Sequence, residues 1–185
     1  YNAMRRVVLG DRNLEKISLL NDLSRKMVMG SCSLDYAFRK MKDIKNKTRY
    51  SNLAVLSALT ISAPFFAIMF GGTFKDSIVS FVVMAVETAF LLFIGRYKVI
   101  YFLTNFLGAF ISTVLVMILA KFFFIHNPVS IIIVSLMPLV PGVQITNSVR
   151  DFMAGDYLSG IIGVQSAIFV SIAIALGVVM GLKIV

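Results

Sequence analysis

Long uncharged apolar runs, separated by short polar turns, dominate the chain after residue 50. Four such runs cover residues 53–70, 77–94, 99–120 and about 158–180, and only Glu87 interrupts one of them. A helix rises about 1.5 Å per residue, so about 18 apolar residues cross most of the hydrocarbon core of a bilayer. The pattern predicts an all-α polytopic membrane protein.

A fifth apolar run, residues 128–143, is shorter and contains Pro138 and Pro141. Proline removes a backbone donor and clashes with the preceding helical turn. We therefore expect five transmembrane helices, the fourth of which breaks before it crosses fully. In the last span, Gly177 and Gly181 are four residues apart, which predicts that another helix packs closely against them.

The first 50 residues follow a different, amphipathic pattern. Apolar residues recur every three or four positions over 13–29, and Gly30 is well placed to end that helix. A second helix is predicted from Ser33, whose hydroxyl can cap it. Residues 4–9 contain a β-branched pair and read as a strand whose partners would lie upstream, so we expect the chain to be part of a longer sequence. The predicted domains are a basic helical region, 1–50, and a transmembrane domain, 51–185.

The distribution of charge predicts the orientation in the membrane. The net charge is +9, and residues 1–50 hold 12 of the 18 Lys and Arg residues but only 5 of the 9 acidic ones. Lys and Arg are retained on the cytoplasmic side, so the N-terminus is predicted to be cytoplasmic. This also explains the basic charge without a nucleic-acid partner. Five spans then place Arg96, Lys98 and Arg150 inside, and Lys75, Lys121 and Lys183 outside.

Composition restricts the chemistry further. Of the residues, 58% are hydrophobic and 15% are charged, and Cys32 is the only cysteine. One thiol forms neither an internal disulfide nor a thiolate cluster for a metal. The sequence also contains no H-E-x-x-H, G-x-S-x-G or Walker A motif. We therefore expect no enzyme activity, no cofactor and no metal.

The densest group of polar residues in the membrane region directly follows the two prolines. Interrupted membrane helices expose backbone groups that line protein cavities, and many transporters bind their solutes there. The candidate substrate-binding residues are Pro138, Pro141, Gly142, Gln144, Asn147 and Arg150. An alternative remains open: Pro141 and Gly142 end the fourth span, residues 144–156 form a plain cytoplasmic loop, and Arg150 is only a topology signal.

Two acidic residues are candidates for proton coupling, Glu87 and Asp151. Glu87 is the eleventh residue of an 18-residue run that is otherwise uncharged, so it lies near the middle of the membrane. A charge there costs several kcal/mol unless it is paired, hydrated or protonated. The alternative for Glu87 is a structural hydrogen bond to a neighbouring helix.

Three segments carry a family resemblance: Leu-Met-Pro-Leu-Val-Pro-Gly at 136–142, Asn-Ser-Val-Arg-Asp at 147–151 and Gly-Asp-Tyr-Leu-Ser-Gly at 155–160. They resemble the threonine/serine exporter family, specifically the half-length version that works with a separate small membrane subunit. The resemblance covers nearly the whole chain. It implies a cytoplasmic N-terminal domain, five spans, and export of threonine, serine or, in related two-subunit systems, dicarboxylates such as succinate.

Together these features favour a subunit of a secondary exporter in the inner membrane. In this hypothesis Arg150 pairs with a substrate carboxylate, and Asp151 or Glu87 handles a coupling proton. The expected partners are the lipid bilayer, a small-molecule substrate and a second small membrane subunit of the same family, with self-association as a further option. The rival hypothesis is a membrane scaffold or regulator that transports nothing and docks a partner through its basic helices.

Overall fold

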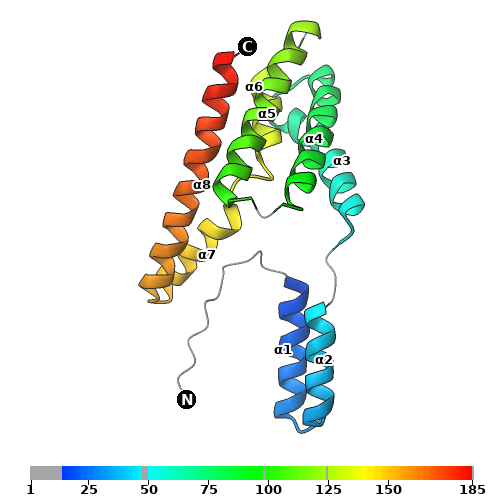
Figure 1. Ribbon diagram of the computed structural model, residues 1–185, viewed down its shortest axis with the longest axis vertical. Coiled ribbons are helices and arrows are strands. Elements are labelled where there is room, and N and C mark those ends of the chain that lie inside the picture. The colour runs from blue at the N-terminus through cyan, green and yellow to red at the C-terminus, as the bar shows by residue number, and fades with distance from the viewer. Residues whose placement is uncertain (1–13, 47–49, 98, 124, 185) are drawn as a thin grey trace. The chain divides into compact units, whose positions relative to one another are not determined.

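The computed structural model describes residues 14–46, 50–97, 99–123 and 125–184 (Figure 1). The chain divides into two compact units, 1–51 and 52–185, and each is described by itself. Eight α-helices make up the regular structure of the described residues, as predicted for an all-α protein. The predicted strand at 4–9 lies outside the described residues.

Unit 1 is a helical hairpin. Helix α1 (Leu14–Val28) is followed by Gly30, whose φ of 69° is a conformation that glycine adopts without strain. Helix α2 (Leu34–Asn46) begins where Ser33 Oγ accepts a hydrogen bond from the Tyr36 N–H at 3.3 Å, so the predicted cap is confirmed. The two helices bury a small core of Leu23, Ala37 and Ile44 between them.

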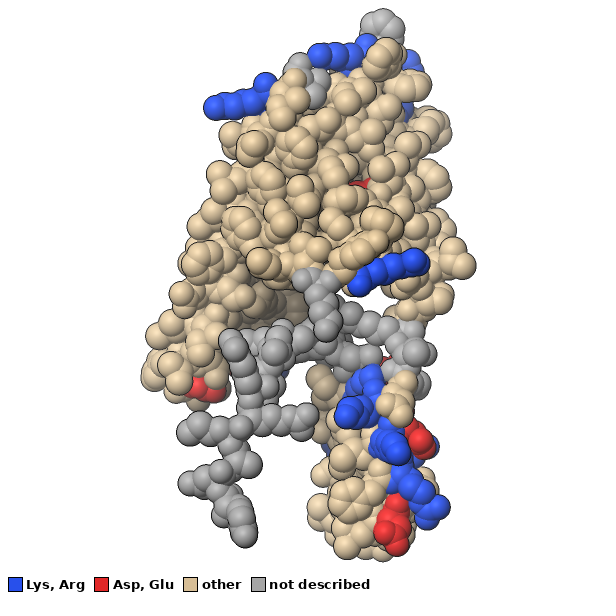
Figure 2. Space-filling view, in the orientation of Figure 1, with Lys and Arg blue, Asp and Glu red and all other residues tan. Residues whose placement is uncertain are grey.

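Unit 2 contains six helices. They are α3 (Asn52–Met69), α4 (Phe74–Ile94), α5 (Tyr101–Phe122), α6 (Pro128–Leu136), α7 (Gly142–Met153) and α8 (Tyr157–Ile184). Four of them, α3, α4, α5 and α8, are long and apolar enough to cross a membrane. The visible surface of unit 2 is almost entirely uncharged, and its basic side chains lie toward its two ends (Figure 2). Lipid is the solvent that suits such a surface.

The turn between α3 and α4 is built around Asp76. Gly71 has a φ of 80°, and the chain then enters α4 through a capping box between Thr73 and Asp76. Asp76 Oδ2 accepts hydrogen bonds from Thr73 N at 2.8 Å and Thr73 Oγ1 at 2.9 Å, and Oδ1 accepts one from His126 N at 3.0 Å. The cap starts α4 at Phe74, three residues earlier than predicted. The same carboxylate ties this turn to the loop between α5 and α6.

Helices α4, α5 and α6 share the central core. Val83 of α4 lies in one buried cluster with Val116 of α5 and with Ile131 and Ile132 of α6. On the α3 side, Met84 clusters with Ala63, Ala67 and Val134. Helix α4 is therefore enclosed by three helices along this part of its length.

Helix α8 packs against α5 through the predicted glycine pair. A Cβ on Gly177 would meet the backbone oxygen of Phe106, and one on Gly181 would meet the side chain of Thr113. Residue numbers rise together along the two helices, so α5 and α8 run parallel. The prediction that another helix lies against Gly177 and Gly181 is confirmed.

The predicted break in the fourth span is confirmed. Helix α6 ends at Leu136, and the chain resumes helical structure only at Gly142. Residues 144–153 then form most of α7 rather than a loop, so the plain-loop alternative is wrong up to Met153. Helix α7 packs chiefly against α8, where Ser148 faces Gly163 and Phe152 faces Gly160.

Candidate functional site

The interruption between α6 and α7 is partly buried. Leu139 is 4% exposed and its methyl groups lie beside Gly108 of α5, as does the side chain of Leu91 of α4. Pro141 is also buried, whereas Pro138 and Gly142 are exposed. Backbone bonds such as Val140 N to Leu136 O at 3.2 Å fold this segment into turns. The irregular backbone therefore lies against helices α4 and α5, as it must in lipid.

Glu87 is enclosed next to this interruption. On α4, Glu87 lies one turn after Val83 and one turn before Leu91. Val83 clusters with Val116 and Ile131, and Leu91 and Leu139 both lie beside Gly108. The helix register between these two levels puts Glu87 level with Ser112 of α5 and Ser135 of α6.

Helix α3 adds a hydroxyl to the same level. Met84 clusters with Ala63, and because α3 and α4 form an antiparallel hairpin, moving one turn along each helix brings Glu87 level with Thr60. Five buried polar side chains thus form what we call the polar layer: Thr60, Glu87, Thr88, Ser112 and Ser135, all at most 5% exposed. The layer lies within one turn of the helix interruption.

Hydrogen bonding separates the members of the polar layer into two groups. Ser112 Oγ donates to Ala109 O at 3.2 Å, and Ser135 Oγ donates to Ile132 O at 2.8 Å, so these hydroxyls are satisfied by their own helices. Among the described residues, no partner is found for Thr60 Oγ1, Thr88 Oγ1 or either carboxyl oxygen of Glu87. The alternative role of Glu87, a hydrogen bond to a neighbouring helix, is therefore not what the structure shows.

The remaining candidate residues lie on α7. Gln144, Asn147 and Asp151 share one face of this helix by their spacing of three and four, and all three are half-buried. Asn147 Nδ2 donates to Val143 O at 2.7 Å, a bond within the helix. Arg150 is exposed and lies in the last turn of α7, off that face.

The structure does not bring all the predicted site residues together. Helix α4 packs against α3, α5 and α6, whereas α7 packs chiefly against α8. Glu87 therefore lies in the bundle interior, and Arg150 lies toward the end of unit 2 at which α7 ends. A single small solute does not contact Glu87 and Arg150 together in this conformation.

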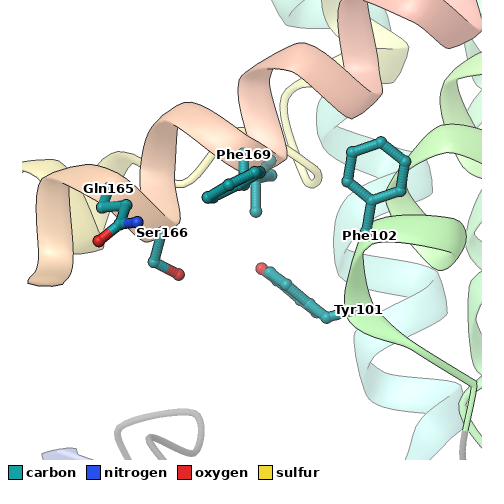
Figure 3. A pocket seen from close by; sticks show the side chains of 6 residues that line it. Tyr101, Phe102, Gln165, Ser166 and Phe169 are labelled. Carbon is teal, nitrogen blue, oxygen red and sulfur yellow. The ribbon is translucent and has the colours of Figure 1, made fainter.

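Sequence reasoning missed a groove between α5 and α8. Tyr101 and Phe102 of α5 face Gln165, Ser166 and Phe169 of α8 across an open space of about 280 Å³ (Figure 3). The signal in the sequence was a polar pair, Gln165 and Ser166, inside an apolar span. The parallel pairing of α5 with α8 was needed to place that pair opposite two aromatic rings.

The two ends of unit 2 carry separate groups of basic residues. The α3–α4 turn and the α5–α6 loop meet through Asp76 and His126, and α8 runs parallel to α5 (Figure 1). Lys75, Lys121 and Lys183 therefore belong to one end. Arg96 and Arg150 belong to the other end, because α4 is antiparallel to α5 and α7 is antiparallel to α8.

A bundle of long apolar helices with one broken helix and a buried polar layer is the architecture of a multi-pass membrane protein, and broken helices of this kind occur in many transporters. The whole chain, residues 1–185, matches the ThrE family model, whose description is "Putative threonine/serine exporter". The chain belongs to this threonine/serine exporter family. No curated protein and no solved structure matches it.

Proposed function

We propose that this chain is one subunit of a secondary exporter that carries small polar metabolites out across the inner membrane. Threonine and serine are the first candidates because of the family, and dicarboxylates such as succinate are the second. The observation that carries the proposal is the helix interruption at 137–141, which lies within one turn of the buried polar layer. Broken helices beside polar groups at mid-membrane form solute sites in many transporters.

The residues on α7 are proposed to guide the solute to that interruption. Arg150 is exposed at the end of α7, where its guanidinium can pair with a solute carboxylate through two charge-assisted hydrogen bonds. Gln144 and Asn147 lie on the half-buried face of α7, along the helix between Arg150 and the interruption at Pro141. Asp151, half-buried on that face, is a candidate to exchange a proton at the same entrance.

The proposed orientation places the N-terminus and unit 1 in the cytoplasm. Residues 1–50 hold most of the basic charge, and Lys and Arg near a membrane span resist translocation. Arg96 and Arg150 are then at the cytoplasmic end of unit 2, and Lys75 and Lys121 at the outer end. Arg150 thus lies on the side from which an exporter takes up its solute.

A second small membrane subunit of the same family is the proposed partner. An open apolar groove of about 430 Å³ on unit 2 supports this, because it is lined by Ile145 of α7 and by small residues of α8, of which Ser171 and Ala175 are exposed. Small residues on an exposed helix face allow a further helix to approach closely. Self-association through this face is the alternative assembly.

Flux from proteoliposomes tests the proposal. The chain is reconstituted alone and together with a small membrane protein of its family, and radiolabelled threonine, serine and succinate are followed under an imposed proton gradient. We expect flux of at least one solute, larger with both proteins present. If the two proteins bind each other but carry none of the three solutes, the chain is a scaffold and the export proposal is wrong.

A further inference from the structure

We propose that the Glu87 carboxylate binds either a proton or the ammonium group of an amine-bearing solute, and never both. This rests on the proposed export function and deepens it by naming the solute group and the coupling group. The observation behind it is a side chain 1% exposed at mid-membrane whose two oxygens have no hydrogen-bond partner among the described residues.

No other titratable group faces Glu87 from the described helices that pack against it. Helices α3 and α6 contain none at all, and α5 contains only Tyr101 and Lys121, at its two ends. On α4 itself, Lys75 and Asp76 lie in the first turn, about 16–18 Å from Glu87 along the helix. Glu87 is therefore the one ionisable group of the polar layer.

A lone carboxylate in such a place needs one positive charge. An uncompensated charge inside a membrane protein costs several kcal/mol, and this cost is removed by a proton or by a bound cation. A single carboxylate binds either the proton or the cation. A proton and an ammonium group therefore compete for the same oxygen atoms of Glu87.

The unpartnered hydroxyls make an ammonium group the fitting cation. An ammonium has three N–H donors and no acceptor. Thr60 Oγ1 and Thr88 Oγ1 are buried and unpartnered, and together with the Glu87 carboxylate they offer three acceptors at one level of the bundle. Ser112 and Ser135, which already donate to their own helices, complete the polar surroundings.

Competition for one carboxylate couples export to the entry of protons. Facing outward, Glu87 takes a proton from outside, and the solute's ammonium group leaves. Facing inward, the proton dissociates into the cytoplasm, and a new ammonium group binds to the carboxylate. One proton enters for each solute exported, and no covalent bond is made or broken.

The proposal favours amino acids over dicarboxylates at this position. Serine and threonine bring one ammonium group to Glu87, whereas succinate brings only further negative charge. Glycerate has the carboxylate and hydroxyl of serine but carries a second hydroxyl in place of the amine. Serine and glycerate therefore form a matched pair of probes for the amine.

The test measures protons released when a solute binds to the purified chain, alone and together with a small membrane protein of its family. Titration calorimetry in two buffers of different ionisation enthalpy, at a series of pH values, gives the number of protons released per solute. We expect up to one proton per serine or threonine as the pH is lowered, weaker serine binding at lower pH, and no comparable binding of glycerate. Loss of a charge-assisted hydrogen bond in Glu87→Gln should weaken serine binding by about 10-fold to 100-fold and abolish proton release.

Companion variants separate binding from folding. Glu87→Asp keeps the charge and should keep proton release, while Thr60→Ala should weaken serine binding and leave proton release in place. Ser57→Ala is the control for Thr60→Ala, because Ser57 is exposed one turn away on α3. If Glu87→Gln does not fold, the wild type and Glu87→Asp still test the proposal, because both should release protons when serine binds.

Three results would overturn the inference: serine binding without proton release, equal binding of glycerate, or failure of the wild type to bind serine and threonine. The export function is judged separately, by flux. If Glu87→Gln exports serine at the wild-type rate at every pH, the coupling role of Glu87 is wrong, whereas the export function is supported.

Discussion

The backbone oxygen of Phe106 on α5 lies 2.5 Å from the position that a Cβ atom on Gly177 of α8 would occupy. Ala109 and the backbone nitrogen of Phe110 lie 3.0 Å from the same position. Two of these neighbours are backbone atoms, which cannot move away as a flexible side chain can. Close contact between α5 and α8 therefore depends on the missing side chain at Gly177.

Gly177→Leu should separate α5 from α8. Overpacking a helix contact costs about 1–3 kcal/mol, and contact with backbone atoms puts this site at the upper end. We expect a several-fold lower folded yield and a lower Tm in detergent, measured by size-exclusion chromatography and thermal unfolding. Val179→Leu, at an exposed position on the same helix, is the control and should behave as the wild type. Wild-type behaviour of Gly177→Leu would contradict the packing described above.

Asp76→Ala should destabilise unit 2. The substitution leaves the Thr73 and His126 N–H groups without their acceptor, and hydrogen bonds to a charged group contribute about 1.5–3 kcal/mol each. We expect a lower Tm in detergent. Lys75→Ala changes the exposed neighbour and should alter the Tm little. Equal effects of the two substitutions would show that the buried carboxylate does not hold the two loops.

Labelling of introduced cysteines tests the orientation. In a chain whose Cys32 is replaced by serine, cysteines at positions 75 and 121 should react with a membrane-impermeant thiol reagent added from outside. A cysteine at position 96 should react only after the membrane is permeabilised. The expected pattern follows from the basic residues of 1–50. External labelling at 96 would reverse the proposed topology.

Arg150→Lys should impair flux and leave membrane insertion intact. The planar guanidinium makes two parallel hydrogen bonds to a carboxylate, which an ammonium group does not reproduce. We expect flux to fall about 10-fold, the effect of losing roughly 1.4 kcal/mol. Arg96→Lys, exposed at the same end of unit 2, is the matched control. Normal flux in Arg150→Lys would leave Arg150 as a topology signal only, because positive-inside sorting accepts either residue.

The sequence predicted the long spans and the interruption well, because both depend on local properties. Apolar length determines whether a helix can cross lipid, and two prolines three residues apart, Pro138 and Pro141, favour a break, whereas the single Pro64 is accommodated within α3. The start of α4 was less accurate. Its capping box uses Thr73 and Asp76, which precede the apolar run 77–94 that predicted the helix.

The sequence did not predict which distant segments contact one another. Gly177 and Gly181 show that a helix packs closely there, but they do not say that the helix is α5. Helix α7 has apolar residues at helical spacing, Ile145, Val149 and Phe152, but the polar residues between them favoured a site or a loop over a helix that packs on α8. Glu87 was recognised from its position, but its level with Thr60 and its lack of a partner depend on how α3 and α4 pair.

Hydrogen bonds of Asp76 and Asn127 hold the α3–α4 turn and the α5–α6 loop together. His126 N donates to Asp76, Asn127 Nδ2 donates to Gly71 O at 3.4 Å, and Gly72 is pressed against Ser130. Separating the two turns requires breaking all of these contacts at once, whereas moving them as a block breaks none. A movement of unit 2 at this end that keeps these contacts therefore shifts α3, α4, α5 and α6 together.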